Sequence, residues 1–200
     1  MPPSPPRLPP VVRALLIANT AVYLLELVAF EPLMGLFALW PLHTPYFEPW
    51  QLVSYAFLHN GLLHIAFNML GLFMFGRRLE WLWGSRRFGL YYLACVLSAA
   101  ATELAVQNAT GNIDPVAGAS GGVFGLLLGY AWYFPRDEFL VLPVPVPLPA
   151  WLLAIIYGGI ELFLGVTGNQ PGVAHFAHLG GMLGGALAIL YWRARRRFSS

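Results

Sequence analysis

Residues 118–134 read GASGGVFGLLLGYAWYF, an apolar stretch that opens with a serine between small residues. Gly121, Gly125 and Gly129 recur every four residues, so on a helix they form one face against which a second helix can pack closely. Ser120 lies at the start of this helix. Because a polar residue at membrane depth is costly and needs a reason, Ser120 is the first candidate for a functional residue.

The composition is that of a membrane protein. Of the 200 residues, 58% are hydrophobic and only 10% are charged, whereas about a quarter of the residues in soluble domains are charged. The mean hydropathy is +0.64. The chain contains six apolar segments, which cover residues 11–30, 55–75, 88–106, 120–134, 149–166 and 174–192. We therefore expect an all-α, polytopic membrane protein rather than a soluble domain.

The positive charges determine the expected topology, because all eleven basic residues are arginines. They lie around the start of the first segment, between the second and third, between the fourth and fifth, and after the sixth: Arg7, Arg13, Arg77, Arg78, Arg86, Arg87, Arg136, Arg193, Arg195, Arg196 and Arg197. Cytoplasmic loops carry the excess of basic residues. This alternation predicts a bundle of six transmembrane helices with both termini in the cytoplasm.

The chain divides into one domain and two tails. Residues 1–10 are Pro-rich and predict a disordered cytoplasmic tail, residues 11–193 make up the six-helix domain, and residues 194–200 make up a basic cytoplasmic tail. The first residues lack the pattern of a cleaved signal peptide. Alternating prolines over residues 143–149 predict a stiff, extended connection. Cys95 is the single cysteine, which excludes an intramolecular disulfide.

Three polar residues on three different segments are expected at one depth in the membrane. Counted from the arginines that mark the cytoplasmic boundary, the distances along the helices are ~24 Å for Ser120 to Arg136, ~22 Å for His178 to Arg193 and ~20 Å for His64 to Arg77. The hydrocarbon core is roughly 30 Å thick. The three side chains therefore predict a single site somewhat below the outer surface, open to water from that side.

Ser120 and His178 together have the minimum equipment for nucleophilic hydrolysis. A serine hydroxyl needs a base to attack a carbonyl, and a neutral imidazole can take its proton and later protonate the leaving amine. Gly181 lies on a small-residue face of the sixth segment, which allows that segment to approach the fourth. The alternative for Ser120 is a helix cap on a packing face, and for His178 a buried histidine bonded to a carbonyl.

His64 and Asn68 are four residues apart and share one helix face. Both can donate hydrogen bonds to a developing negative oxygen, although the alternative is that they join helices together. His59 lies above them and is expected to support the site or anchor a loop. We expect no metal and no other cofactor, because the chain has no HExxH motif and no carboxylate spaced for zinc on the same helix. His175, one turn before His178, is a weaker candidate for the base and is expected to be structural. Nothing in the sequence assigns a role to Glu161.

Three motifs occur in order on the second, fourth and sixth segments. They are His59-x4-His64-x3-Asn68, then Gly118-Ala119-Ser120-Gly121, then Ala177-His178-x2-Gly181-x3-Gly185. Each motif alone is weak, but the ordered set with its topology resembles the rhomboid family of intramembrane serine proteases. The resemblance covers nearly the whole chain after the Pro-rich tail and corresponds to the minimal six-helix bacterial form.

The resemblance implies a Ser–His dyad without an acidic third member. Ser120 matches the nucleophile, His178 the general base, and His64 with Asn68 the oxyanion-stabilising pair, assisted by the Ser120 backbone N–H. Gly118 and Gly121 match the glycines of the GxSG motif. Phe124 matches an aromatic position that packs on the catalytic histidine. One departure is that Trp50-Gln51 stands where many rhomboids carry a Trp-Arg pair in the first outer loop.

The expected function is cleavage of transmembrane segments in a bacterial inner membrane, at an active site open to the extracytoplasmic side. The expected partners are transmembrane substrates that enter laterally from the lipid, and the bilayer itself, with no nucleic acid. The sequence does not indicate the substrate, the oligomeric state or the gating element. A catalytically silent relative that binds transmembrane helices is the alternative. A small-solute transporter is a third reading, which the absence of visible inverted repeats disfavours.

Overall fold

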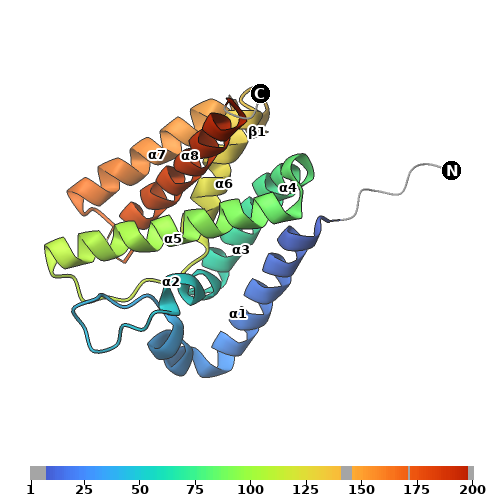
Figure 1. Ribbon diagram of the computed structural model, residues 1–200. Helices are drawn as coiled ribbons and strands as arrows, with labels where there is room; N and C mark the ends of the chain where they lie inside the picture. Colours follow the sequence, from blue (N-terminus) through green and yellow to red (C-terminus); the bar gives the residue numbers. More distant parts are fainter. Residues whose placement is uncertain (1–7, 141–145, 171, 198–200) are drawn as a thin grey trace.

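The computed structural model describes residues 8–140, 146–170 and 172–197. Its elements are helices and two short strands (Figure 1). In chain order they are α1 (Pro10–Phe37), α2 (Gln51–Ser54), the 3-10 turn η1 (Tyr55–Phe57), α3 (Leu62–Gly71), the π-helical turn η2 (Leu72–Gly76), α4 (Arg77–Trp83), α5 (Ser85–Thr110), α6 (Ser120–Tyr133), β1 (Glu138–Leu140), β2 (Pro147–Pro149), α7 (Ala150–Thr167) and α8 (His175–Arg197).

Five of the six predicted segments each correspond to one helix, but the second does not. Residues 51–57 and Leu62–Trp83 meet at an angle of 101°. Gly61 lies at the turn with φ +100°, a conformation that side chains rarely adopt. The chain therefore turns sharply before α3, and only the part from Leu62 onward continues as the helical rod that we expected over residues 55–75.

Three helices in the described part of the chain are long and apolar enough to cross a membrane, namely α1, α5 and α7, and the bent pair around Gly61 would add a fourth. α6 has 14 residues, which corresponds to about 21 Å and is shorter than a hydrocarbon core of roughly 30 Å. The chain is a multi-pass membrane protein with a helical architecture. The number of six spans and the cytoplasmic position of both termini stay predictions.

Small residues bring the central helices together. In Figure 1, α5 crosses in front of α6 and α8, and these three helices form the most extensive packing in the molecule. The glycine face of α6 meets α5, because a Cβ at Gly121, Gly125 or Gly129 would run into Ala99, Cys95 or Tyr91 respectively. The expected small-residue face of α6 is therefore filled by α5 on one side and, at Gly181, by α8 on the other.

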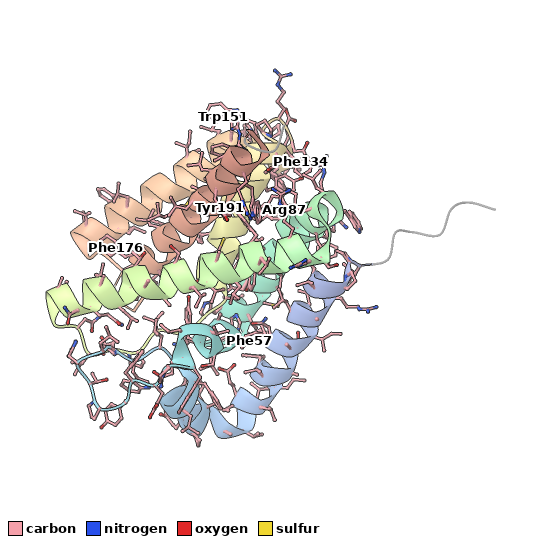
Figure 2. The ribbon with its side chains drawn as sticks, in the orientation of Figure 1. Phe57, Arg87, Phe134, Trp151, Phe176 and Tyr191 are labelled. Carbon is pink, nitrogen blue, oxygen red and sulfur yellow. The ribbon has the colours of Figure 1, made fainter. Side chains whose placement is uncertain are left out.

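The Arg-bearing ends of the helices gather on one side of the molecule, at the upper right in Figure 1. The Glu80 carboxylate accepts hydrogen bonds from the backbone N–H groups of the first turn of α1, at distances of 2.9 and 2.8 Å. Arg87 lies over the ring of Trp192 at 4.1 Å, which joins the start of α5 to the end of α8 (Figure 2). Arg78 pairs with Asp137 just after α6.

The loop between α1 and α2 is held in place by a buried side chain. The Gln51 amide oxygen accepts hydrogen bonds from the backbone N–H groups of Trp40 and Glu48, and its NH2 group donates to the carbonyls of Leu36 and Tyr46. The Trp50 indole also donates to Leu36. Gln51 thus anchors this loop, which the sequence predicts to be the first outer loop, through four hydrogen bonds. It stands at the position where we noted the departure from a Trp-Arg pair.

The proline-rich connection before α7 is partly β-structured. β1 pairs antiparallel with β2, with Glu138 opposite Pro149 and Leu140 opposite Pro147. This two-stranded ribbon departs from a purely helical chain, and it uses the extended geometry that alternating prolines favour. Residues 141–145, with the first two prolines of the alternation, lie outside the described residues, as do the first seven residues of the expected N-terminal tail.

Candidate active site

Ser120 is the first residue of α6, and the chain that leads to it is held on both sides. The backbone of Val116 exchanges two hydrogen bonds with Leu39 of the loop between α1 and α2. The Gly118 N–H donates to the Tyr55 carbonyl at 2.9 Å. Gly118 has φ +137°, and a Cβ there would lie 2.8 Å from Nε2 of His64. A glycine is therefore required at 118 both for the backbone turn and for the approach of His64.

His178 lies in the first turn of α8, with its Nε2 2.7 Å from the Ser120 hydroxyl oxygen. Its ring stacks on Phe124, with centroids 4.4 Å apart and planes within 5°. The two helices touch through their backbones, because a Cβ on Gly181 would overlap the carbonyl oxygen of Gly121. The predicted close approach of the fourth and sixth segments thus brings a serine and a histidine into hydrogen-bond contact.

His64 and Asn68 lie on α3 and line the same cavity as Ser120 and His178. The Asn60 backbone N–H donates to Nδ1 of His64 at 3.2 Å. Since a neutral imidazole has one donor and one acceptor nitrogen, Nε2 of His64 is then the donor, and this is the atom that faces Gly118. Asn68 uses one amide hydrogen on the His64 carbonyl, which leaves its second amide hydrogen free for another acceptor.

His59 supports this arrangement from behind. Its side chain is fully buried, and its ring meets the ring of His64 edge-on at 5.0 Å. Its backbone N–H donates to the Glu26 carboxylate on α1, at 2.9 and 3.2 Å. His59 is not among the described residues that line the cavity. It connects α1, through Glu26, to His64 on α3.

The sequence assigned no role to Glu161 and a structural one to His175, and both side chains lie beside His178. Oε2 of Glu161 is 2.8 Å from Nδ1 of His178 and 2.6 Å from Nδ1 of His175. All three side chains are buried. Their donor atoms lie within 4.8 Å of one another, a spacing that could also hold a metal ion. The carboxylate comes from α7, so a search for ligands spaced along one helix could not find it.

The cavity that contains these residues has a volume of about 850 Å³ and extends between α3, η2, α6 and α7. Most of its lining side chains are apolar, among them Phe67, Leu127 and Leu153. Its polar lining residues include Ser120, His178, His64 and Asn68. The arrangement combines a serine in contact with a base, hydrogen-bond donors nearby and an apolar chamber.

Comparison with known protein families gives a direct match. The family model described as "Rhomboid domain" matches residues 46–195. The chain belongs to the rhomboid family. It is 35% identical over 146 residues to RHOMBOID-like protein 4 of Arabidopsis thaliana, which covers 70% of this chain and 33% of that protein.

Further rhomboid relatives come from bacteria and yeast. The rhomboid protease GlpG of Serratia proteamaculans is 31% identical over 182 residues, covering 88% of this chain and 60% of that protein. Rhomboid protein 1 of Saccharomyces cerevisiae, a mitochondrial protein, is 29% identical over 146 residues, covering 68% of this chain and 40% of that protein. This rhomboid chain therefore spans between a third and three fifths of the length of these relatives.

Proposed function

We propose that this rhomboid is an intramembrane serine endopeptidase that cleaves transmembrane segments of other membrane proteins. The observation that carries the proposal is the 2.7 Å contact between His178 Nε2 and the Ser120 hydroxyl, in a cavity largely lined by apolar side chains. The names of its GlpG relatives, which are proteases, support the same reaction class.

In the proposed mechanism, Ser120 attacks the scissile carbonyl and His178 takes the hydroxyl proton. The resulting oxyanion accepts hydrogen bonds from His64, Asn68 and the backbone N–H of Ser120, which has no partner of its own in the first turn of α6. His178 then gives the proton to the leaving amine. Water from the outer side hydrolyses the acyl-enzyme, with His178 again acting as the base. The rate falls in acid, because a protonated imidazole has no lone pair for the serine proton.

The substrate reaches the site laterally from the lipid, between α3 and α7. Both helices line the cavity, and both carry exposed apolar side chains, such as Leu63 and Phe67 on α3 and Ile156 on α7. The substrate helix must unwind locally, because a peptide bond inside a helix is shielded by its own hydrogen-bonded turn. Gly or Pro near the cleaved bond favours this unwinding, and the family resemblance implies a small residue just before the bond.

The location follows from the topology predicted from the arginines. We propose that the chain lies in a bacterial inner membrane with its active site open to the extracytoplasmic side. The outer loop and the chain before Ser120 lie on the side of the molecule opposite the Arg-bearing ends (Figure 1). With those ends in the cytoplasm, the catalytic water comes from outside the cell.

A fluorophosphonate probe tests whether the serine is activated. Wild type, Ser120→Ala and His178→Ala are labelled in detergent or in liposomes. We expect labelling of the wild type alone, because only that protein has both the nucleophile and its base. If folded wild type stays unlabelled and also leaves a reporter transmembrane segment intact, the alternative function, helix binding without catalysis, replaces this one.

A further inference from the structure

Glu161 completes a line of three side chains through His178. Ser120 contacts one nitrogen of the His178 ring at 2.7 Å, and Glu161 contacts the other at 2.8 Å. We propose that Glu161 is a positioning residue that orients His178 and stabilises its protonated form, so that the serine is activated through a Ser–His–Glu chain. This inference rests on the proposed hydrolytic function and departs from the Ser–His dyad that the family resemblance implies.

The carboxylate has two histidine partners, which hold it beside His178. Nδ1 of His175 forms a hydrogen bond to Oε2 of Glu161 at 2.6 Å, and the same oxygen forms an ion pair with Nδ1 of His178 that is not aligned as a hydrogen bond. A Cβ on Gly165 would lie 3.2 Å from the Cβ of His175. This close approach of α7 and α8, one turn from Glu161, fixes the position of the carboxylate.

The carboxylate determines which nitrogen of His178 carries the proton. A neutral imidazole has a single N–H. With an anion beside Nδ1, the proton is favoured on that nitrogen, and the lone pair of Nε2 is left to accept from Ser120. Phe124 stacks on the ring and fixes its plane, but a flat apolar surface does not distinguish the two nitrogens. Glu161 supplies the missing distinction.

The carboxylate also faces the charge that forms during the reaction. When His178 takes the serine proton it becomes a cation, and an anion 2.8 Å away in a buried site stabilises it. The other titratable groups that act on His178 are His175 from its own helix, His64 from α3 and Glu103 from α5. Within the described part of the chain, Glu103 forms no ion pair with a histidine.

The test compares Glu161→Gln and Glu161→Asp with Glu103→Gln, which removes a buried carboxylate of the same region that lacks the contact. Labelling rates and cleavage of a reporter transmembrane segment are measured from about pH 5 to pH 9 and normalised to folded protein. We expect Glu161→Gln to lower both rates by roughly 10²–10⁴-fold. We also expect the acid limb of the pH–rate profile, where activity falls in acid, to move to lower pH in Glu161→Gln, because the protonated histidine has lost its counter-ion. Glu161→Asp keeps the charge, so its rates and the position of its acid limb should lie between those of wild type and Glu161→Gln. Glu103→Gln should shift the acid limb far less.

A structural role would give a different result, in which Glu161→Gln lowers the folded fraction but leaves the normalised rate and the acid limb unchanged. That result, or equal shifts in the two Gln variants, overturns the proposal. If Glu161→Gln does not fold, the test rests on Glu161→Asp. A wild-type rate and a wild-type acid limb in Glu161→Asp would also overturn the proposal. Loss of wild-type activity on adding a chelator would mean that the three side chains bind a metal instead. Failure of the proposed function is distinct, because wild type would then match Ser120→Ala.

Discussion

At the scale of single residues, the contact between Ser120 and His178 depends on the absence of a side chain at Gly181. A Cβ there would overlap the Gly121 carbonyl oxygen, and neither partner is a flexible group that can move aside. We predict that Gly181→Ala separates α8 from α6, lowers stability by about 1–3 kcal/mol and abolishes labelling of Ser120. Thermal unfolding in detergent and probe labelling measure the two effects.

Gly159→Ala on α7 is the matched control, because nothing lies within 4 Å of a Cβ at that position. Alanine is the better helix former, so this variant should be as stable as wild type or more stable, with normal labelling. Equal behaviour of Gly181→Ala and Gly159→Ala would mean that the backbone contact between α6 and α8 does not position the site.

His64 is expected to act on the transition state rather than on the substrate. Its Nε2 faces Gly118 as a donor, since Nδ1 accepts from Asn60. Removing one oxyanion donor costs about 10²–10³-fold in kcat. We predict such a loss for His64→Ala with little change in KM, measured on a reporter transmembrane segment. Leu62→Ala, at a nearby exposed position that does not line the cavity, should keep both kcat and KM. A rise in KM alone for His64→Ala would indicate a role in binding.

At the scale of elements, the side-chain amide of Gln51 holds the loop between α1 and α2 in place. Gln51→Ala would remove the partner of the Trp40 and Glu48 N–H groups and of the Tyr46 carbonyl. The Leu36 carbonyl would keep its hydrogen bond from the Trp50 indole. Because these groups are only partly buried, water can replace some of the lost hydrogen bonds. We predict a loss of about 0.5–1.5 kcal/mol in the free energy of unfolding and faster hydrogen exchange over residues 38–50. Gln51→Glu keeps an acceptor oxygen and loses both N–H donors, so its stability and its rate of hydrogen exchange should lie between those of wild type and Gln51→Ala. Unchanged exchange in Gln51→Ala would contradict this role.

The sequence predicted the helices well and one break poorly. Five segments could be predicted because apolar runs of their length form helices in lipid. The break in the second segment could not be predicted, because Tyr55–Phe57 is as apolar as the helix that follows it. Only Gly61 indicates that the chain turns there. The pairing of Pro147–Pro149 with β1 was also beyond prediction, since a proline-rich run indicates extended geometry but not its partner.

At the scale of the whole molecule, the central prediction is that the outer loop and the ribbon lie on opposite sides of the membrane. Cys95 is the single cysteine and is buried, so Cys95→Ala gives a cysteine-free background. Single cysteines are then placed at His43 in the loop between α1 and α2, at Ile113 between α5 and α6, and at Glu138 in β1. A membrane-impermeant thiol reagent added outside should label His43→Cys and Ile113→Cys but not Glu138→Cys. Labelling of Ile113→Cys and Glu138→Cys from the same side would contradict six spans.

The structure adds one contact to the site that was predicted from the sequence, namely that of Glu161 with His178. Counting residues from the arginines predicted that Ser120, His178 and His64 share one depth and one site. In the structure all three line one cavity, and their common depth in the membrane stays a prediction. The contact of Glu161 with His178 could not be predicted, because it depends on how α7 is rotated and shifted against α8. Its only signal was an acidic residue inside an apolar segment, which marks a function without naming it.

Cleavage of a transmembrane segment in liposomes tests the central claim most directly. Purified wild type, Ser120→Ala and His178→Ala are reconstituted with a reporter segment that has a Gly-containing outer end, and the products are mapped by mass spectrometry. We predict one cut near the outer end of the segment by wild type, and none by either variant. Cleavage that survives Ser120→Ala, or an intact reporter with correctly folded wild type, would contradict the assignment of Ser120 and His178 as the hydrolytic pair.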